Sequence, residues 1–288
     1  MKLEEKALLV QLKISRWSAN RIDKQISRDV AVQHQTSLAA GWYRKNLLPH
    51  SREYESITSA ESAIRTYHYD NTLPWMDGGV RILPSRNFMA YSDTMRKLQE
   101  AYKKTVESFL AAYPALVSKA QRDLNGMFKP SDYPVPENLE KHFNTQISIL
   151  PVPTVEDFRV QLSAEQTQWV QEQAQAQIKE SIQGAVADLW TRIRDVLQRM
   201  VERLSEPDAI FRDSLIQNVK DLTHSLDVLN LTDDPSIAEV RKEIMALTRH
   251  GAETLRNNKT VRHQVAVNAD SILKKMSAYM GGGNGHQA

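Results

Sequence analysis

Histidine is the side chain best suited to acid–base chemistry near neutral pH, and the chain contains eight of them. No two lie one helical turn apart, the spacing that lets a helix bind zinc through two imidazoles. His68 is the strongest single candidate, because it stands between Tyr67 and Tyr69 and Asp70 could orient its ring. One histidine beside one aspartate is not a triad, so a partly buried histidine in an aromatic cluster is the simpler interpretation.

Other catalytic patterns are equally weak. Asp77 beside Gly78-Gly79, and the pair Glu156-Asp157, are most simply turn and capping residues. No glycine-rich turn precedes Lys-Ser or Lys-Thr, as a phosphate-binding loop requires. The chain has no cysteine, which excludes disulfides, thiolate metal sites and thiol nucleophiles. We therefore expect no enzymatic activity, no cofactor and no metal site.

The strongest functional pattern combines cations with aromatic rings near the N-terminus. Residues 1–48 hold nine Lys/Arg and four Asp/Glu. Such side chains neutralise phosphates and stack on the bases of single-stranded nucleic acid. The net charge of only +2 and the lack of a recognisable nucleic-acid module weigh against this interpretation. The candidate residues are Arg16, Trp17, Arg21, Lys24, Arg28, Trp42, Tyr43, Arg44 and Lys45.

Composition sets the class of protein. With 41% hydrophobic and 25% charged residues among 288, the balance is that of a globular protein. No run approaches the roughly 20 apolar residues of a membrane span, so we expect no membrane partner. The first eleven residues carry four charges and lack the apolar core of a signal peptide. The cytoplasm is therefore the expected location.

The elements that must position these residues differ along the chain. Alternating apolar residues predict strands at Val10–Ser15, Val80–Leu83, Gln146–Leu150 and Phe158–Leu162, the last two as an edge hairpin around Pro151–Pro153. Residues 18–48 are polar and favour helix. Further helices are expected over Glu53–Tyr69, from an N-cap at Ser85 to Phe109, with a kink or break at Pro114, and over Ala115–Leu124.

From Ala164 onward the pattern is purely helical. No proline occurs before Pro207, and apolar residues recur every three or four positions, which predicts one helix to Leu204. Further helices are expected over residues 210–229, from an Asp234 N-cap with Pro235 to Leu255, and over residues 259–280. The sequence thus predicts an α+β fold, predominantly helical, with a small antiparallel sheet embedded in helices followed by a long-helix bundle.

Three regions follow from this pattern: a mixed α/β domain over residues 1–163, a bundle or coiled-coil-like region over 164–280, and a flexible glycine-rich tail over 281–288. Charge alternates along the chain. Residues 1–163 hold 22 Lys/Arg against 18 Asp/Glu, residues 164–240 hold 7 against 14, and residues 241–288 hold 8 against 3. Unlike segments are therefore expected to pack together, within one chain or between copies.

The helical stripe predicts a homo-oligomer held by residues 164–280. A bundle in which later helices of the same chain cover the stripe is the open alternative to this oligomer. In the irregular segment 71–84, Gly78-Gly79 predicts a turn and Trp75 is the expected anchor. The candidate interface residues are Trp75, Trp169, Ile178, Ile182, Leu189, Trp190, Ile193 and Met200.

Residues 8–165 also resemble a known family. The matching segments are Trp17, Asn46–Pro49, Thr72–Trp75, Asp77–Pro84, Ala112–Pro114, Asp132–Pro134, Pro151–Pro153 and Asp157–Val160. In order and spacing they are similar to a phage and mobile-element family classed only as a domain of unknown function, often found near a chelatase-type AAA+ ATPase and a von Willebrand A-type protein. The resemblance implies an accessory or assembly role in a bacterial cell that carries the phage or element, with an AAA+ ATPase as candidate partner. It implies no catalytic residue.

Two functions from different classes are therefore expected. The first is a non-enzymatic phage-type scaffold or adaptor that self-associates through its long helices and serves an AAA+ partner. The second is a single-stranded nucleic-acid-binding protein of phage recombination or replication. Binding to an oligonucleotide separates them.

Overall fold

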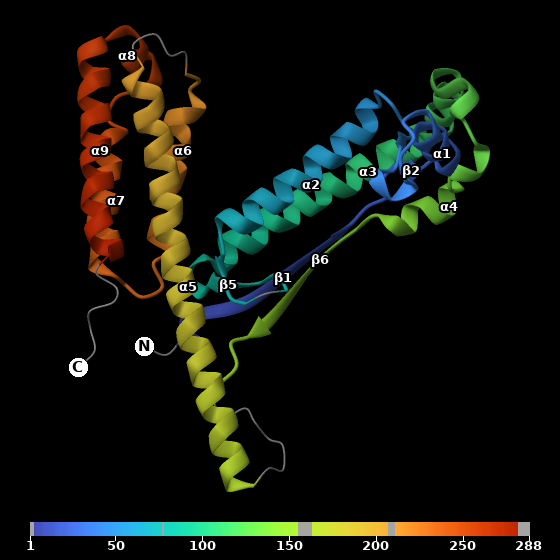
Figure 1. The fold of residues 1–288 in the computed structure, drawn as a ribbon. Coiled ribbons are helices and arrows are strands. Elements are labelled where there is room, and N and C mark those ends of the chain that lie inside the picture. Colours follow the sequence, from blue (N-terminus) through green and yellow to red (C-terminus); the bar gives the residue numbers. More distant parts are fainter. Residues whose placement is uncertain (1–2, 77, 155–162, 207–210, 282–288) are drawn as a thin grey trace. The chain divides into compact units, whose positions relative to one another are not determined.

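The computed structural model describes residues 3–76, 78–154, 163–206 and 211–281 and divides the chain into two compact units (Figure 1). Unit 1 comprises Met1–Gln11, Tyr69–Tyr91 and Ser148–Ala288, and unit 2 comprises Leu12–His68 and Ser92–Ile147. The expected fold class is confirmed: helices predominate and a small antiparallel sheet accompanies them. The expected boundary at residue 164 differs from this division, because the sheet of unit 1 shares a core with the later helices.

The main sheet has four strands in the order β4-β5-β1-β6. Its strands are β1 (Ala7–Ser15), β4 (Leu73–Pro74), β5 (Val80–Pro84) and β6 (Asn144–Pro151). Antiparallel pairing places Leu9 opposite Ile82 and Leu73 opposite Ile82 on the other side. The turn between β4 and β5 uses Gly78 and Gly79 at φ of 96° and 80°, a region that glycine adopts without strain. Three of the expected strands are thus confirmed, and the fourth, Phe158–Leu162, lies outside the described residues.

The long helix of unit 1, α5 (Ala164–Ser205), spans 42 residues as the sequence predicts. Its start has a physical cause: Ser163 Oγ accepts from the N–H of Gln166, whose side chain accepts from the N–H of Ser163 in return. At about 1.5 Å per residue the helix is about 63 Å long.

Four further helices complete unit 1: α6 (Ser214–Leu229), α7 (Pro235–Leu247), α8 (Ala252–Asn257) and α9 (Lys259–Gly281). Asp234 caps α7 by accepting from the N–H of Ser236, and Pro235 occupies the first turn, as predicted. The helix expected to continue to Leu255 instead ends at Leu247. Gly251 adopts extended backbone before α8, so the chain turns there.

Helices α6 and α9 pack against α5, and α7 packs against α6 and α9. Together with the sheet they form the core of unit 1. Oppositely charged segments pair inside this bundle. Lys275 of α9 lies 2.6 Å from Glu239 and 2.8 Å from Glu243 of α7, and Arg241 lies 3.3 Å from Asp227 of α6. The charge alternation along the sequence is therefore at least partly satisfied within one chain.

Unit 2 is built on two long helices, α2 (Arg52–Asp70) and α3 (Phe88–Leu124), which extend beyond it at one end. Of the two outcomes expected at Pro114, an interruption is wrong, because α3 continues through it to Leu124. Proline removes one backbone hydrogen bond at a cost of about 3 kcal/mol. Burial of the neighbouring Phe109 and Tyr113, worth about 2 kcal/mol each, offsets that loss.

The N-cap expected at Ser85 is also wrong. Ser85 begins a 3-10 turn, Ser85–Asn87, and its Oγ donates to the carbonyl of Lys6 at 2.9 Å. Helix α3 begins only at Phe88. A hydroxyl taken by the neighbouring strand end cannot cap the helix.

Residues 18–48 depart most from expectation. In place of a largely helical segment they form β2 (Asn20–Ile22), α1 (Lys24–Gln33), a 3-10 turn (Leu38–Ala40) and β3 (Arg44–Asn46). Strands β2 and β3 make a separate antiparallel pair. Four short segments complete unit 2: 3-10 turns at Asn125–Met127, Pro130–Asp132 and Glu140–His142, and helix α4 (Pro136–Leu139). The expected tail from residue 282 lies outside the described residues.

Candidate nucleic-acid interface

The cationic lobe, defined here as residues 19–46 and 127–132, is built on the β2–β3 pair. Arg21 lies opposite Lys45 in that pair. The N–H of Asp23 donates to the carbonyl of Tyr43 at 3.0 Å, which extends the pairing by one residue. The Asp23 carboxylate then caps α1, accepting from the N–H of Gln25 at 3.1 Å. One aspartate therefore joins the strand pair to the helix.

A buried ionic network lies behind the strands. Lys45 is only 2% exposed, and its Nζ lies 2.8 Å from Asp132, 3.5 Å from Asp23 and 2.6 Å from the carbonyl oxygen of Met127. An ammonium has three donors, and these three acceptors match them. Lys129 approaches Asp23 from the surface at 3.4 Å. Lys45 thus fixes residues 127–132 against the strand pair.

The same network sets the protonation of Asp23. Burial by itself raises the pKa of this carboxyl, but hydrogen bonds from the N–H groups of Ile26 and Gln25 and the ammonium of Lys129 outweigh it. The pKa of Asp23 is therefore below its ordinary value, and the group is ionised at neutral pH. The ionised Asp23 carboxylate therefore caps α1 and also pairs with Lys45 and Lys129.

Four cations line one hollow on the surface of this lobe. The hollow has a volume of about 340 Å³, and its wall contains Arg21, Lys24, Arg28 and Lys129 together with the carboxylates Asp23 and Asp132. Four cations against two carboxylates leave the wall with a net positive charge. Lys24 and Arg28 lie one turn apart on α1, so they share a face of the helix. Cations that converge on one concavity attract an anion such as a phosphate group.

Two exposed aromatic side chains of the lobe, Trp42 and Tyr43, immediately precede β3. Trp42 is 57% exposed and Tyr43 is 40% exposed. The N–H of Tyr43 donates to Ser27 Oγ at 3.0 Å, which ties the aromatic pair to α1. Exposed rings held by backbone bonds are suited to stacking against a flat partner.

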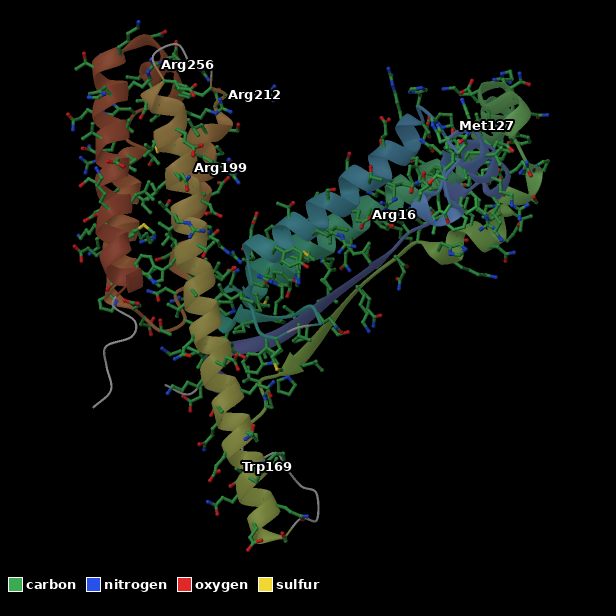
Figure 2. All side chains as sticks on the ribbon, in the orientation of Figure 1. Arg16, Met127, Trp169, Arg199, Arg212 and Arg256 are labelled. Atoms are coloured by element: carbon green, nitrogen blue, oxygen red, sulfur yellow. The ribbon has the colours of Figure 1, made fainter. Side chains whose placement is uncertain are left out.

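Two of the predicted residues serve the core of unit 2 instead. Arg16 pairs with Glu61 at 2.6 Å and donates to the Tyr54 hydroxyl (Figure 2). Trp17 packs edge-on against Tyr54 and Tyr113. Lys45 is buried, as described above. The structure therefore brings six of the nine predicted residues to the surface of the lobe: Arg21, Lys24, Arg28, Trp42, Tyr43 and Arg44.

The sequence analysis missed other members of this surface. Lys129 joins the hollow from more than 80 residues away, and no local pattern marks it. Several large apolar side chains are also exposed on the lobe: Ile22, Val30, Val32, Leu38 and Met127. Exposed apolar side chains gathered in one place commonly mark an interaction surface. Most of these apolar side chains lie within residues 22–43, and this proximity in the sequence was the signal that could have identified the surface.

The predicted interface residues lie mostly inside unit 1. Leu189, Trp190, Ile193 and Met200 are buried in its core, and Trp75 is only 4% exposed, as expected of an anchor. Ile178 and Ile182 are partly buried and pack against the same core. The helical stripe is thus covered by helices of its own chain. Trp169, at 62% exposed, is the exception (Figure 2).

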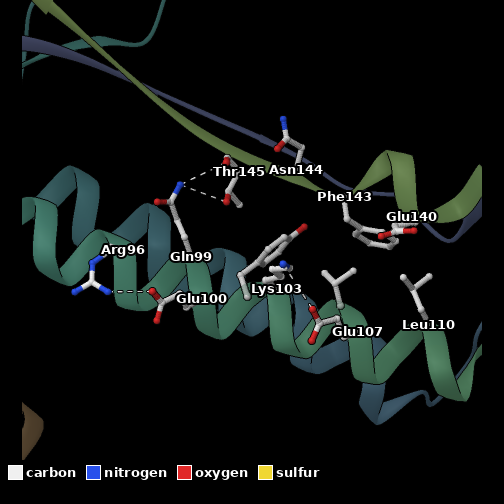
Figure 3. A pocket seen from close by; sticks show the side chains of 12 residues that line it. Arg96, Gln99, Glu100, Lys103, Glu107, Leu110, Glu140, Phe143, Asn144 and Thr145 are labelled. Carbon is white, nitrogen blue, oxygen red and sulfur yellow. Dashed lines mark hydrogen bonds and ion pairs between the residues drawn. The ribbon is translucent and has the colours of Figure 1, made fainter.

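A second concavity in unit 2 offers no acid–base pair. The groove between α3 and the segment leading into β6 has a volume of about 480 Å³ (Figure 3). Burial raises the pKa of Tyr102 there to about 12, so the phenol stays protonated at neutral pH. Lys103 pairs with Glu107 at 3.9 Å along the helix. The groove therefore presents an apolar floor between paired charges.

The other predicted chemical candidates take ordinary places. His68 is buried on α2. Asp77, Glu156 and Asp157 lie outside the described residues. Within the described ranges, no group of three or more His, Asp or Glu side chains is arranged to hold a metal ion. No helix in the same ranges is long and apolar enough to cross a bilayer.

No protein-family model, curated protein or solved structure matches this chain. The resemblance to a phage and mobile-element family therefore stays an expectation from the sequence.

Proposed function

We propose that the protein is a non-enzymatic binding protein that holds single-stranded nucleic acid on the cationic lobe of unit 2. The observation that carries this proposal is the hollow of about 340 Å³ whose wall holds four cations, Arg21, Lys24, Arg28 and Lys129, against the two carboxylates Asp23 and Asp132. Exposed Trp42 and Tyr43 belong to the same lobe, and the N–H of Tyr43 donates to Ser27 of α1, the helix that carries Lys24 and Arg28.

The arrangement suits a flexible polyanion. Cations around the hollow neutralise phosphates and release their counterions, which stabilises the complex at low salt. Trp42 and Tyr43 supply faces on which unpaired bases stack, at about 1–3 kcal/mol per base. Stacking needs bases that are free of a duplex, so we expect single strands to bind more tightly than double strands of the same sequence.

The scaffold function expected from the sequence has less support. The stripe that was to join copies packs against α9 and α6 of the same chain. Self-association must therefore use another surface, and an AAA+ partner rests on the resemblance alone.

Fluorescence anisotropy with a labelled oligothymidine tests the proposal. Trp42→Ala should weaken binding about 5- to 150-fold, which corresponds to the loss of one stacked base. Trp169→Ala is the matched control, because it also removes an exposed tryptophan but lies in unit 1. Equal affinities for the two variants would contradict the assignment of the lobe.

Salt dependence gives a second readout. Each phosphate contact with a single strand contributes about −0.7 to the slope of the logarithm of the association constant against the logarithm of the salt concentration. Four contacts therefore predict a slope of about −3. Exposed cations and apolar side chains also suit an anionic vesicle surface. If the protein sediments with anionic vesicles and does not bind the oligonucleotide, the proposal is wrong and the lobe binds membranes instead.

A further inference from the structure

The N-terminal part of α5 lacks cover from the bundle. Within the described residues, the first position of α5 that packs against the core of unit 1 is Ile178. Residues 164–177 extend past the ends of α6, α7 and α9 (Figure 1). Trp169 stands on this extension and is 62% exposed (Figure 2). An exposed indole on a part of the helix that the bundle does not cover is a side chain that a partner would stabilise by burying it.

One face of this extension carries a regular set of exposed residues. A helix turns 100° per residue, so positions three or four apart share a face. The face that contains Trp169 runs through Glu165, Trp169, Gln173, Ala176, Glu180 and Gly184, all of which are exposed. Ile178 and Ile182, which pack against the core, lie on the opposite side of the helix. At its C-terminal end, around Glu180 and Gly184, the face borders Trp75 and Met76, which follow β4.

The spacing along this face is symmetric. The steps are four, four, three, four and four residues, which is the same sequence of steps in either direction. An antiparallel copy of the helix can therefore lie along it with every exposed position opposite another. In that register Trp169 faces Glu180, Gln173 faces Ala176, and Glu165 faces Gly184.

A groove of unit 1 lies where the facing tryptophan arrives. It has a volume of about 600 Å³, and its wall includes Trp75, Met76, Glu180 and Gly184. A Cβ placed on Gly184 would meet nothing within 4 Å, so the wall is open there. Trp169 is 11 residues from Glu180 on the same straight helix, about 16 Å away, so it cannot fill its own groove.

We propose that a second copy of this chain docks here, as a symmetric antiparallel dimer in which each Trp169 enters the groove beside Gly184 of the other copy. The contact is isologous, so both tryptophans are covered at once. The indole N–H is a donor and the Glu180 carboxylate of the second copy accepts it.

The chemistry of the extension suits such self-pairing. Between residues 164 and 177 the charged side chains are Glu165 and Glu172, and the register places Glu165 opposite Gly184 and Glu172 opposite Gln177. No like charges meet. Six glutamines lie in the same stretch, and an amide both donates and accepts, so identical surfaces can hydrogen-bond to each other.

Sedimentation equilibrium of the full chain is the first test. The wild-type protein should approach twice 32.8 kDa with rising concentration. Trp169→Ala should raise the dissociation constant at least about 30-fold, the size expected for a central anchor. Gly184→Glu should have a similar effect through the groove, and circular dichroism should show both variants folded. Trp42→Ala, in unit 2, is the control and should leave the dimer unchanged.

Cross-linking tests the register. The chain has no cysteine, so Glu165→Cys combined with Gly184→Cys provides the thiols for a short bis-maleimide. The two positions lie about 28 Å apart in one helix but face each other between copies. The double variant should form covalent dimers and each single variant should not. A wild-type protein that stays monomeric, or single variants that cross-link as in a parallel pair, would overturn the proposal.

Discussion

Replacing Lys45 by Met tests whether the buried ionic network supports the lobe. The substitution keeps an unbranched side chain, one atom shorter, but removes its charge, its two hydrogen bonds and its ion pair with Asp132. It leaves the carboxylates of Asp23 and Asp132 and the carbonyl of Met127 without their central donor. Because Lys45 is only 2% exposed, water does not replace that donor easily.

The expected cost follows from what remains. Breaking a buried ion pair by removing one partner costs about 3–5 kcal/mol. Asp23 keeps Lys129 at 3.4 Å and its bonds to α1, and Asp132 keeps Arg21 at 3.8 Å. These residual partners place the cost near the lower limit, at about 3 kcal/mol.

Hydrogen exchange of the full chain measures this effect locally. A loss of about 3 kcal/mol should speed exchange of the β2, α1 and β3 amides about 150-fold, while peptides from α5 to α9 exchange as before. Lys129→Met is the matched control: it removes a charge from the same network, but Lys129 is half exposed, so the cost should stay below about 1 kcal/mol. If both variants exchange alike, the network does not stabilise the lobe and the reasoning is refuted.

Three further predictions concern other parts of the molecule. Trp75→Ala should lower the free energy of unfolding of unit 1 by about 3–5 kcal/mol in urea denaturation, because the indole is buried in the core. Because the pKa of Asp23 is lowered in the folded state, its ionised carboxylate stabilises unit 2 at pH values above the ordinary carboxyl pKa of about 4. This stabilisation is lost as the pH falls further, so the stability difference between wild type and Asp23→Asn should shrink below about pH 4 in thermal melts. Arg28→Ala should reduce the salt slope of oligothymidine binding by about 0.7, whereas Arg199→Ala, on α5, should not change it.

The sequence was sufficient where a pattern is local. Helix α5 follows from a proline-free stretch with regular apolar spacing, and α7 follows from Asp234 and Pro235. The same stripe on α5 could not reveal its partner, because helices of one chain and helices of another cover an apolar face equally well. The structure resolves this in favour of α9 and α6.

The lobe shows what a local pattern cannot predict. Strands β2 and β3 have three residues each and pair across more than 20 positions, so neither has enough alternation to be recognised. Lys45 was predicted to be a surface cation, and the partners that explain its burial are distant in sequence: Asp23, Asp132 and the carbonyl of Met127. Trp42 and Tyr43 could be identified from their residue types alone, because their exposure does not depend on a partner from a distant part of the sequence.

The exposed face of α5 escaped the sequence analysis for a different reason. Its members are polar or small except for Trp169, and a search for apolar periodicity passes over them. Symmetric spacing of exposed residues becomes visible only when burial separates the two sides of the helix.

Hydrogen exchange of the full chain with and without oligothymidine tests the central claim most directly. The account predicts slower exchange in residues 20–46 and 127–132 on binding, unchanged exchange in α6 to α9, and loss of the effect at high salt. Binding that slows exchange only in unit 1, or the absence of any binding at low salt, would contradict the assignment of the cationic lobe as a single-stranded nucleic-acid interface.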